Sequence, residues 1–234
     1  ARVIDLCHNV MAQDVTQAAF ILASAYRYFP DGTVFTCVVD PGVGTDRAVV
    51  CMETNDQLFL APDNGLLSMV AAENPPERIQ VVENRELFLS SVSSTFHGRD
   101  IFAPVAAHLC LGAAVEEVGP PLGGIQRLRL PRPVRTASGE LRGEIIHADR
   151  FGNLITNITE SALETSLSCE PAEARVELGS TSLEGIRGSY GEVEEGEVLA
   201  LIGSGGYLEV AVNGGSAARQ LGHTRGDEVR LSCG

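Results

Sequence analysis

The sequence predicts two domains: an α/β N-terminal domain, with a mixed, largely parallel sheet flanked by helices, and an all-β C-terminal small barrel or sandwich. The chain has 234 residues, enough for one or two domains with sizeable cores. Strand-like and helix-like stretches alternate in the first half, whereas short strand-like runs separated by glycines and acidic turns fill the second. A stretch rich in proline and glycine lies between them, so we expect domains over residues 1–120 and 141–234 and a linker over 121–140.

The N-terminal half begins directly in a strand-like run over residues 1–6, and we expect that the chain starts inside a domain. Asp14 and Gln17 resemble a helix capping box, and apolar residues at helical spacing continue up to Phe29. Further elements are predicted as strands over residues 33–39, 48–52 and 58–60, and as a helix over 102–111 that ends at Gly112. This alternation is typical of an α/β layer with a largely parallel sheet.

The C-terminal half contains short runs of strand character separated by turn residues. These runs cover residues 143–147, 154–158, 173–177, 197–202, 207–212 and 228–232. Many short strands without an alternating helix favour a small barrel or sandwich.

Composition excludes several classes of chemistry. All 17 basic residues are arginine, so the chain has no lysine for a Schiff base or for a Walker-type phosphate site. With 31 acidic residues the net charge is −14, which argues against a nucleic-acid or anionic-membrane partner. A hydrophobic content of 44% is that of a folded domain, and the apolar runs are too short to span a bilayer.

The six cysteines show neither a CxxC pair nor metal-ligand spacing. Several lie inside apolar runs, so we expect reduced, core-filling cysteines in a cytoplasmic protein and no metal site. The six are Cys7, Cys37, Cys51, Cys110, Cys169 and Cys233.

Residues 40–47 follow a predicted buried strand, the place where α/β proteins tend to bind ligands. Gly42 and Gly44 lack the third glycine and the following helix of a dinucleotide-binding loop, so we reject that interpretation. A purely structural turn, with Asp40 at its start and Pro41 inside it, would also explain the segment.

Three more segments carry reactive or binding groups, and each also has a structural explanation. Residues 94–100 enter a helix and contain His97, for which packing or capping would suffice. Residues 147–157 contain a turn between two predicted strands, which carries a carboxylate, an aromatic face and an amide that could bind a ligand. An ordinary hairpin would explain the same segment. Residues 203–208 join two strands as a hairpin from which Ser204 could point into a pocket.

In their order and spacing these segments resemble the S-adenosyl-L-methionine (SAM) hydroxide adenosyltransferases, relatives of the fluorinases and chlorinases. The resemblance runs through the whole chain, over residues 3–8, 40–47, 61–65, 94–100, 149–157 and 204–208. It implies a metal-independent enzyme without a cofactor, which hydrolyses SAM to adenosine and L-methionine. Water or hydroxide attacks the ribose C5′ in line with the departing sulfonium.

The resemblance implies a catalytic trio beside the attacking water at Asp40, Arg47 and His97. A sulfonium departs as a neutral thioether, so the difficult step is to activate water, whose pKa is about 15.7. A guanidinium favours hydroxide, while Asp and His can accept or relay the proton and aim the oxygen. Which of the three takes the proton stays open.

The resemblance also implies a cytoplasmic homotrimer in which the second domain of one subunit closes over the first domain of its neighbour, with SAM between them. Asp149 then holds the methionine ammonium, and Ser204 contacts the methionine carboxylate. The implied adenosine contacts are two aromatic rings, an amide that reads the adenine edge and a backbone group: Phe151, Tyr190, Asn153 and Gly214.

Some features depart from the family pattern. Fluorinases have arginines where this chain has Gly205 and Val212, and tryptophan where it has Ile155. The family also begins with a strand–loop–helix segment, carrying a ribose-binding aspartate, that precedes the first residue here. Three alternatives therefore stay open: halide-dependent adenosyl transfer, non-catalytic binding of SAM or adenosine, and a metal hydrolase that adds Asp46 to the trio's carboxylate and imidazole but lacks a second histidine.

Overall fold

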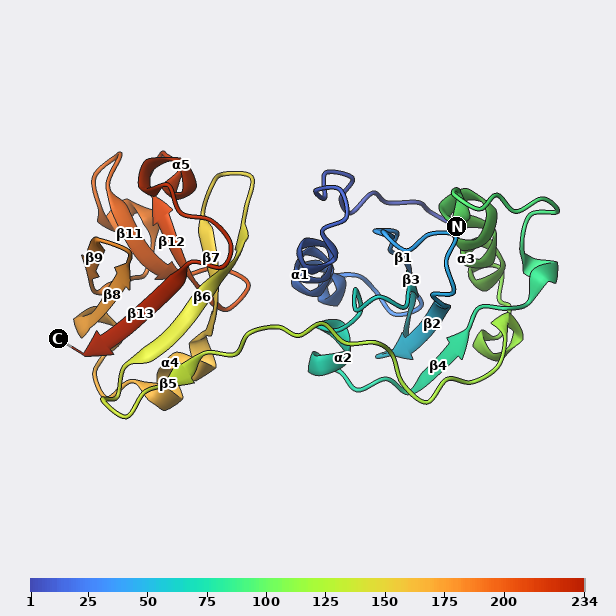
Figure 1. Ribbon diagram of the computed structural model, residues 1–234, viewed down its shortest axis with the longest axis horizontal. Helices are drawn as coiled ribbons and strands as arrows, with labels where there is room; N and C mark the ends of the chain where they lie inside the picture. The colour runs from blue at the N-terminus through green and yellow to red at the C-terminus, as the bar shows by residue number, and fades with distance from the viewer. Residues whose placement is uncertain (234) are drawn as a thin grey trace. The chain divides into compact units, whose positions relative to one another are not determined.

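A computed structural model describes residues 1–233, and Gly234, the last residue of the predicted C-terminal domain, lies outside the described residues. The chain divides into two compact units, Ala1–Arg129 and Leu130–Gly234 (Figure 1). The boundary falls inside the stretch over residues 121–140 that is rich in proline and glycine. Among the described residues, no helix combines the length and the apolar character needed to cross a membrane.

The first unit is built on a sheet with the strand order β1-β3-β2-β4. The Asp14 side chain caps α1 by accepting a hydrogen bond from the backbone N–H of Gln17 at 2.9 Å, as the sequence predicts. A π-helical turn, Gly98–Phe102, leads directly into α3. The helices and strands are α1 (Val15–Ala25), β1 (Val34–Thr36), β2 (Val49–Thr54), β3 (Gln57–Pro62), α2 (Val70–Glu73), β4 (Arg78–Val81) and α3 (Ala103–Cys110).

The sheet is mixed, but the prediction that it is largely parallel is wrong. β1 and β3 are parallel, whereas β2 runs antiparallel to both β3 and β4. The cause is a tight hairpin between β2 and β3, in which Asn55 and Asp56 have φ angles of 50° and 54°. Two consecutive residues with positive φ match the twist of paired antiparallel strands, and an Asn-Asp pair accommodates them readily.

Helices cover both faces of this sheet (Figure 1). On the face of α1, Tyr26 meets the ring of Phe59 edge-on, with centroids 5.8 Å apart. Leu60, the next residue on β3, points to the opposite face, where it packs with Phe102 and Val105 of the α3 segment. The predicted helices on the sheet are therefore confirmed.

The run over residues 1–6 is not a strand, contrary to the prediction. None of residues 1–14 belongs to a sheet in the described chain, and Val3 and Ile4 are 89% and 56% exposed. A strand requires a neighbouring backbone for its ladder hydrogen bonds, and alternating apolar residues do not supply one.

The second unit is rich in strands, and each of the six predicted runs lies in a strand to within one residue. Its sheet has the order β10-β11-β12-β7-β6-β13-β8-β9, with β5 paired to β6, and forms a nearly closed, barrel-like structure around one apolar core. The elements are β5 (Val134–Arg135), β6 (Leu141–Ala148), β7 (Leu154–Thr159), α4 (Glu160–Ser166), β8 (Ala174–Leu178), β9 (Thr181–Glu184), β10 (Ile186–Arg187), β11 (Val198–Ile202), β12 (Tyr207–Val212), α5 (Ala217–Leu221) and β13 (Glu228–Cys233).

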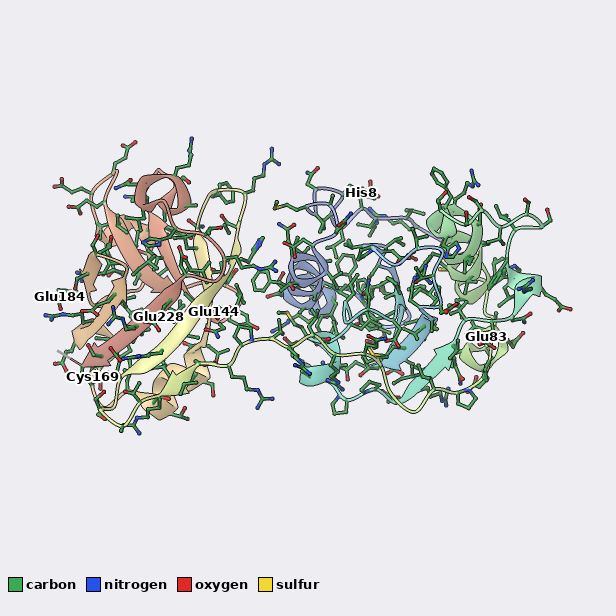
Figure 2. All side chains as sticks on the ribbon, in the orientation of Figure 1. His8, Glu83, Glu144, Cys169, Glu184 and Glu228 are labelled. Carbon is green, nitrogen blue, oxygen red and sulfur yellow. A yellow bond between two sulfur atoms is a disulfide. The ribbon has the colours of Figure 1, made fainter. Side chains whose placement is uncertain are left out.

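The prediction that every cysteine is reduced is wrong for two of them. Cys169 and Cys233 form a disulfide, with Cα atoms 5.8 Å apart and a sequence separation of 64. β13 pairs with β8, and this pairing brings Cys233 to the segment before β8 that carries Cys169 (Figure 2). Cys51 fills the core as expected, and burial raises the pKa of its thiol to about 12, whereas Cys7 and Cys110 are exposed and do not fill the core.

Candidate active site

Asp40 and Arg47 lie on one loop that follows β1. The backbone N–H of Cys37 donates to the carbonyl of Leu60 at 2.8 Å and continues the pairing of β1 with β3 beyond the end of the strand. Asn64, just after β3, donates from its side chain to the carbonyl of Val39 at 2.9 Å. The end of β3 therefore holds the backbone immediately before Asp40. Sequence reasoning assigned no role to Asn64.

Gly44 allows this loop to reach the loop that carries His97. It has a φ of +79°, and a Cβ there would lie 2.5 Å from the backbone oxygen of Ser94. A side chain at this position would therefore meet both backbone strain and a clash. The close approach explains how residues 40–47 meet residues 94–97, which are distant in sequence.

The structure brings Asp40, Arg47 and His97 together. Arg47 Nε donates to Asp40 Oδ1 at 2.9 Å, and Arg47 Nη2 donates to Asp40 Oδ2. Arg47 Nη2 also lies 2.9 Å from His97 Nδ1. The ion pair is largely shielded from water, with the Arg47 and Asp40 side chains 9% and 5% exposed. A bidentate pair in such surroundings has a fixed geometry.

This arrangement determines which groups stay available for chemistry. A guanidinium can only donate, so His97 Nδ1 accepts and the neutral ring carries its proton on Nε2. Within the described chain Arg47 Nη1 has no side-chain or backbone acceptor. Arg47 Nη1–H and His97 Nε2–H can therefore donate to a bound group, and the Asp40 carboxylate beside them keeps lone pairs that can accept.

Asp100 anchors the segment that carries His97. Its carboxylate is buried, lies 2.6 Å from Arg99 Nε and accepts the backbone N–H of Ser93 at 2.8 Å. The Arg99 guanidinium and this backbone N–H lower the pKa of the Asp100 carboxyl. Asp100 therefore holds the backbone that leads to His97.

A second group of candidate residues lies in the C-terminal unit, on the turn between β6 and β7. Asp149 Oδ1 accepts the backbone N–H groups of Phe151, Gly152 and Asn153 at 2.8–2.9 Å. Asn153 Nδ2 donates to Asp149 Oδ2 at 3.0 Å and to the Tyr190 hydroxyl at 3.2 Å. The structure therefore gathers Asp149, Asn153 and Tyr190, as expected of one binding surface.

Of the other predicted contacts, Phe151 joins this group through its backbone N–H, which donates to Asp149 Oδ1. The Phe151 ring is 76% exposed. Ser204 is in the hairpin between β11 and β12, where the backbone N–H of Gly203 donates to the carbonyl of Tyr207 at 2.9 Å. Gly214 lies in the turn after β12, and the structure shows no interaction that joins it to Asn153.

The metal-hydrolase alternative finds no support in the side-chain arrangement. Among residues 1–233, no three His, Cys, Asp or Glu side chains gather as a metal site would require. Both oxygens of Asp40 are instead bonded to Arg47, a cation that would repel a metal ion. Asp46 is exposed and joins neither partner.

Comparison with known families agrees with both units. A family model described as the SAM hydroxide adenosyltransferase N-terminal domain matches residues 1–119, and the C-terminal domain of the same family matches residues 143–230. The chain belongs to this family. The family's N-terminal match contains Asp40, Arg47 and His97, and its C-terminal match contains the group around Asp149.

Individual members of the family resemble the chain over its full length. The (R)-S-adenosyl-L-methionine hydrolase of Salinispora tropica is 42% identical over 100% of this chain and 87% of its own length. The Thermus thermophilus hydrolase is 40% identical over 98% of this chain and 87% of its own. A Nocardia brasiliensis fluorinase is more distant, being 27% identical over 99% of this chain and 87% of its own length. The crystal structure of an uncharacterized conserved protein from Thermotoga maritima superposes with a TM-score of 0.90 at 42% identity, covering 99% of this chain and 89% of that one.

Proposed function

We propose that this protein hydrolyses SAM, in the (R) form that the names of its relatives specify, to adenosine and L-methionine. The observation that carries the proposal is the shielded group of Asp40, Arg47 and His97, which offers charged and neutral donors around one carboxylate. Such a group suits the activation of water, and the family relationship supplies the substrate.

In the proposed reaction one water oxygen forms a bond to ribose C5′ while the bond from C5′ to sulfur breaks. The electron pair of that bond goes to sulfur, which leaves as the neutral thioether of methionine, and the proton that the water loses is released to solvent. Arg47 Nη1 donates to the attacking oxygen and stabilises the negative charge that develops there. Asp40 accepts a hydrogen bond from the water, and the Nε2–H of His97 helps to aim its oxygen.

The group on the C-terminal unit binds the rest of the substrate in this proposal. Asp149 attracts the methionine ammonium, and Ser204 contacts the methionine carboxylate. Phe151 and Tyr190 supply aromatic faces for the adenosine, and Asn153 reads the adenine edge. The backbone at Gly214 also contacts the adenine base.

We further propose a homotrimer in the cytoplasm that uses no cofactor and binds no nucleic acid. The trimer rests on the resemblance, and exposed apolar rings such as Phe151 and Phe96 are suited to be covered by another subunit or by substrate. The cytoplasmic location rests on the free cysteines, Cys51 foremost, while the disulfide is unusual for a reducing compartment. The net charge of −14 opposes binding to a polyanion.

Incubation with each sulfonium epimer of SAM in ¹⁸O-water, with and without chloride or fluoride, tests the reaction. We expect adenosine that carries ¹⁸O at the 5′ position, at a rate independent of halide. A halogenated nucleoside would instead assign the protein to halide-dependent transfer. Tight binding without turnover would leave a non-catalytic SAM-binding protein.

Asp40→Ala and His97→Ala test the catalytic assignment. Because both side chains act on the attacking water, we expect kcat to fall by about 100-fold or more while the Kd for SAM changes little. Asp46→Ala and His108→Ala are matched controls, since each removes the same kind of side chain from an exposed position. Normal hydrolysis by the Asp40 and His97 variants would show that the assignment is wrong.

A further inference from the structure

Glu209 is a half-buried carboxylate in the C-terminal unit that no part of the site described so far uses. It lies on β12, opposite Leu201 of β11 and Ile155 of β7. The pairing of β12 with β7 shifts register between Tyr207 and Glu209, an irregularity of the kind that redirects a side chain near a functional site. Glu209 makes no ion pair and accepts no hydrogen bond among residues 1–233.

The surroundings of Glu209 are those of the proposed SAM site. A Cβ on Gly203 would lie 1.8 Å from Glu209 Oε1, so the carboxylate rests against the backbone immediately before Ser204. The charges of Glu209 and Asp149 both act on the Tyr190 hydroxyl. Burial, and to a smaller extent the charge of Asp149, raises the pKa of the Glu209 carboxyl.

Asp149 alone has little capacity left to bind an ammonium group. Its Oδ1 accepts three backbone N–H groups, which exhausts the lone pairs of that oxygen, and its Oδ2 accepts the amide of Asn153. A single acceptor position on Oδ2 therefore remains. An alkylammonium has three N–H donors and needs further acceptors when it leaves water.

We propose that Glu209 is a specificity-determining residue that shares the α-ammonium group of SAM with Asp149 Oδ2. This inference rests on the proposed function and adds a residue to its binding site. In the free protein the two carboxylates repel each other. An ammonium group bound between them donates to both and removes that repulsion. The pair thus selects for a substrate with a charged amino group.

The test compares SAM with its deaminated analogue, which keeps the sulfonium but has hydrogen in place of the α-ammonium. Glu209→Gln keeps the shape of the side chain and removes its charge. We expect KM for SAM to rise about tenfold or more, since a charge-assisted hydrogen bond is lost, while kcat stays within about twofold. KM for the deaminated analogue is expected to stay unchanged.

Glu144→Gln is the matched control, because Glu144 lies on β6 of the same sheet (Figure 2), is partly buried and makes no ion pair within the described part of the chain. It is expected to behave as the wild-type protein with both substrates. Glu209→Asp, which keeps the charge on a shorter side chain, should recover part of the affinity for SAM. This second variant also provides the test if Glu209→Gln fails to fold.

The proposal is overturned if Glu209→Gln leaves KM for SAM unchanged, or if KM rises equally for SAM and for the deaminated analogue. An equal rise would mean that Glu209 acts on the sulfonium, or that the substitution disturbs the structure of the whole site. If the wild-type protein binds SAM without hydrolysing it, the proposed function fails, and Kd values from calorimetry on the same variants still decide the role of Glu209.

Discussion

Arg47 shows how much of the candidate site depends on one side chain. Its guanidinium bonds to both oxygens of Asp40 and to the ring of His97, and it still has Nη1 free for the attacking oxygen. An ammonium group could not make these contacts together, because it lacks a planar fork of donors. All basic residues of the chain are arginine, and at position 47 arginine is also the cation that suits these contacts best.

Glu209 should reduce the stability of the ligand-free protein. Its pKa is raised in the folded state, so its contribution to stability is fully present below the ordinary pKa of glutamate and is lost as pH rises through the folded pKa. Once it is ionised, the half-buried carboxylate therefore opposes folding. We predict that Glu209→Gln has a higher Tm than the wild-type protein at pH 7.5 and the same Tm at pH 4. A lower Tm at pH 7.5 would contradict this account.

Gly152 should be intolerant of any side chain. Its φ is +88°, and a Cβ there would lie 2.0 Å from Ser216 Oγ. Gly222 has a similar φ of +71° but open space around it. We predict that Gly222→Ala costs about 1 kcal/mol through backbone strain alone, and that Gly152→Ala costs about 2 kcal/mol more through the clash. Urea denaturation measures both values, and equal losses would show that Ser216 yields freely.

At the level of whole elements, short backbone irregularities position the candidate catalytic residues Asp40 and His97. The hairpin at Asn55 reverses the chain between β2 and β3, and the end of β3 then supports Asp40 through Asn64. On the other side, His97 directly precedes the π-helical turn at the start of α3. Such turns interrupt regular helix geometry and are frequent at functional sites.

The disulfide should stabilise the C-terminal unit by linking the last strand to the segment before β8. It closes a loop with a sequence separation of 64, for which chain entropy gives about 4 kcal/mol. We predict that dithiothreitol lowers the free energy of unfolding of this unit by that amount, measured by urea denaturation. A Cys169→Ser, Cys233→Ser double variant should be as unstable as the reduced protein and insensitive to dithiothreitol. Equal stability of oxidised and reduced wild-type protein would contradict this.

The whole molecule divides the proposed chemistry between its units. The group proposed to activate water lies in the unit Ala1–Arg129, and the residues proposed to bind the amino acid and the base lie in Leu130–Gly234. Both groups have exposed apolar neighbours, among them Val38 at 43% and Phe151 at 76% exposure. A site completed by association of chains would cover such surfaces.

The proposed homotrimer predicts that activity depends on protein concentration. We expect the specific activity per chain to fall on dilution, in parallel with the trimer fraction measured by mass photometry. Phe151→Ala should weaken SAM binding at concentrations where the protein is fully trimeric. Constant specific activity in a protein shown to be monomeric would mean that one chain holds a complete site.

Local patterns predicted many of the elements and part of the candidate site. The cap at Asp14, the helix before Gly112 and the strands of the second unit follow from periodicity and turn residues, and the structure confirms them. The strand over residues 1–6 and the largely parallel sheet were wrong, because pairing partners and strand direction are not local properties. The roles of Asn64 and Glu209 had no local signal, since each depends on contacts made after folding.

The sequence by itself determined the two-part organisation, the exclusion of lysine chemistry and the family to which the chain belongs, since composition and ordered motifs survive without coordinates. The tertiary structure decided which atoms of those motifs are still free to act. It bonds His97 Nδ1 to Arg47, fills Asp149 Oδ1 with backbone N–H groups and, among residues 1–233, gives Glu209 no ion-pair partner. The reason is that hydrogen-bond capacity is limited, and only the fold shows where each donor and acceptor has been used.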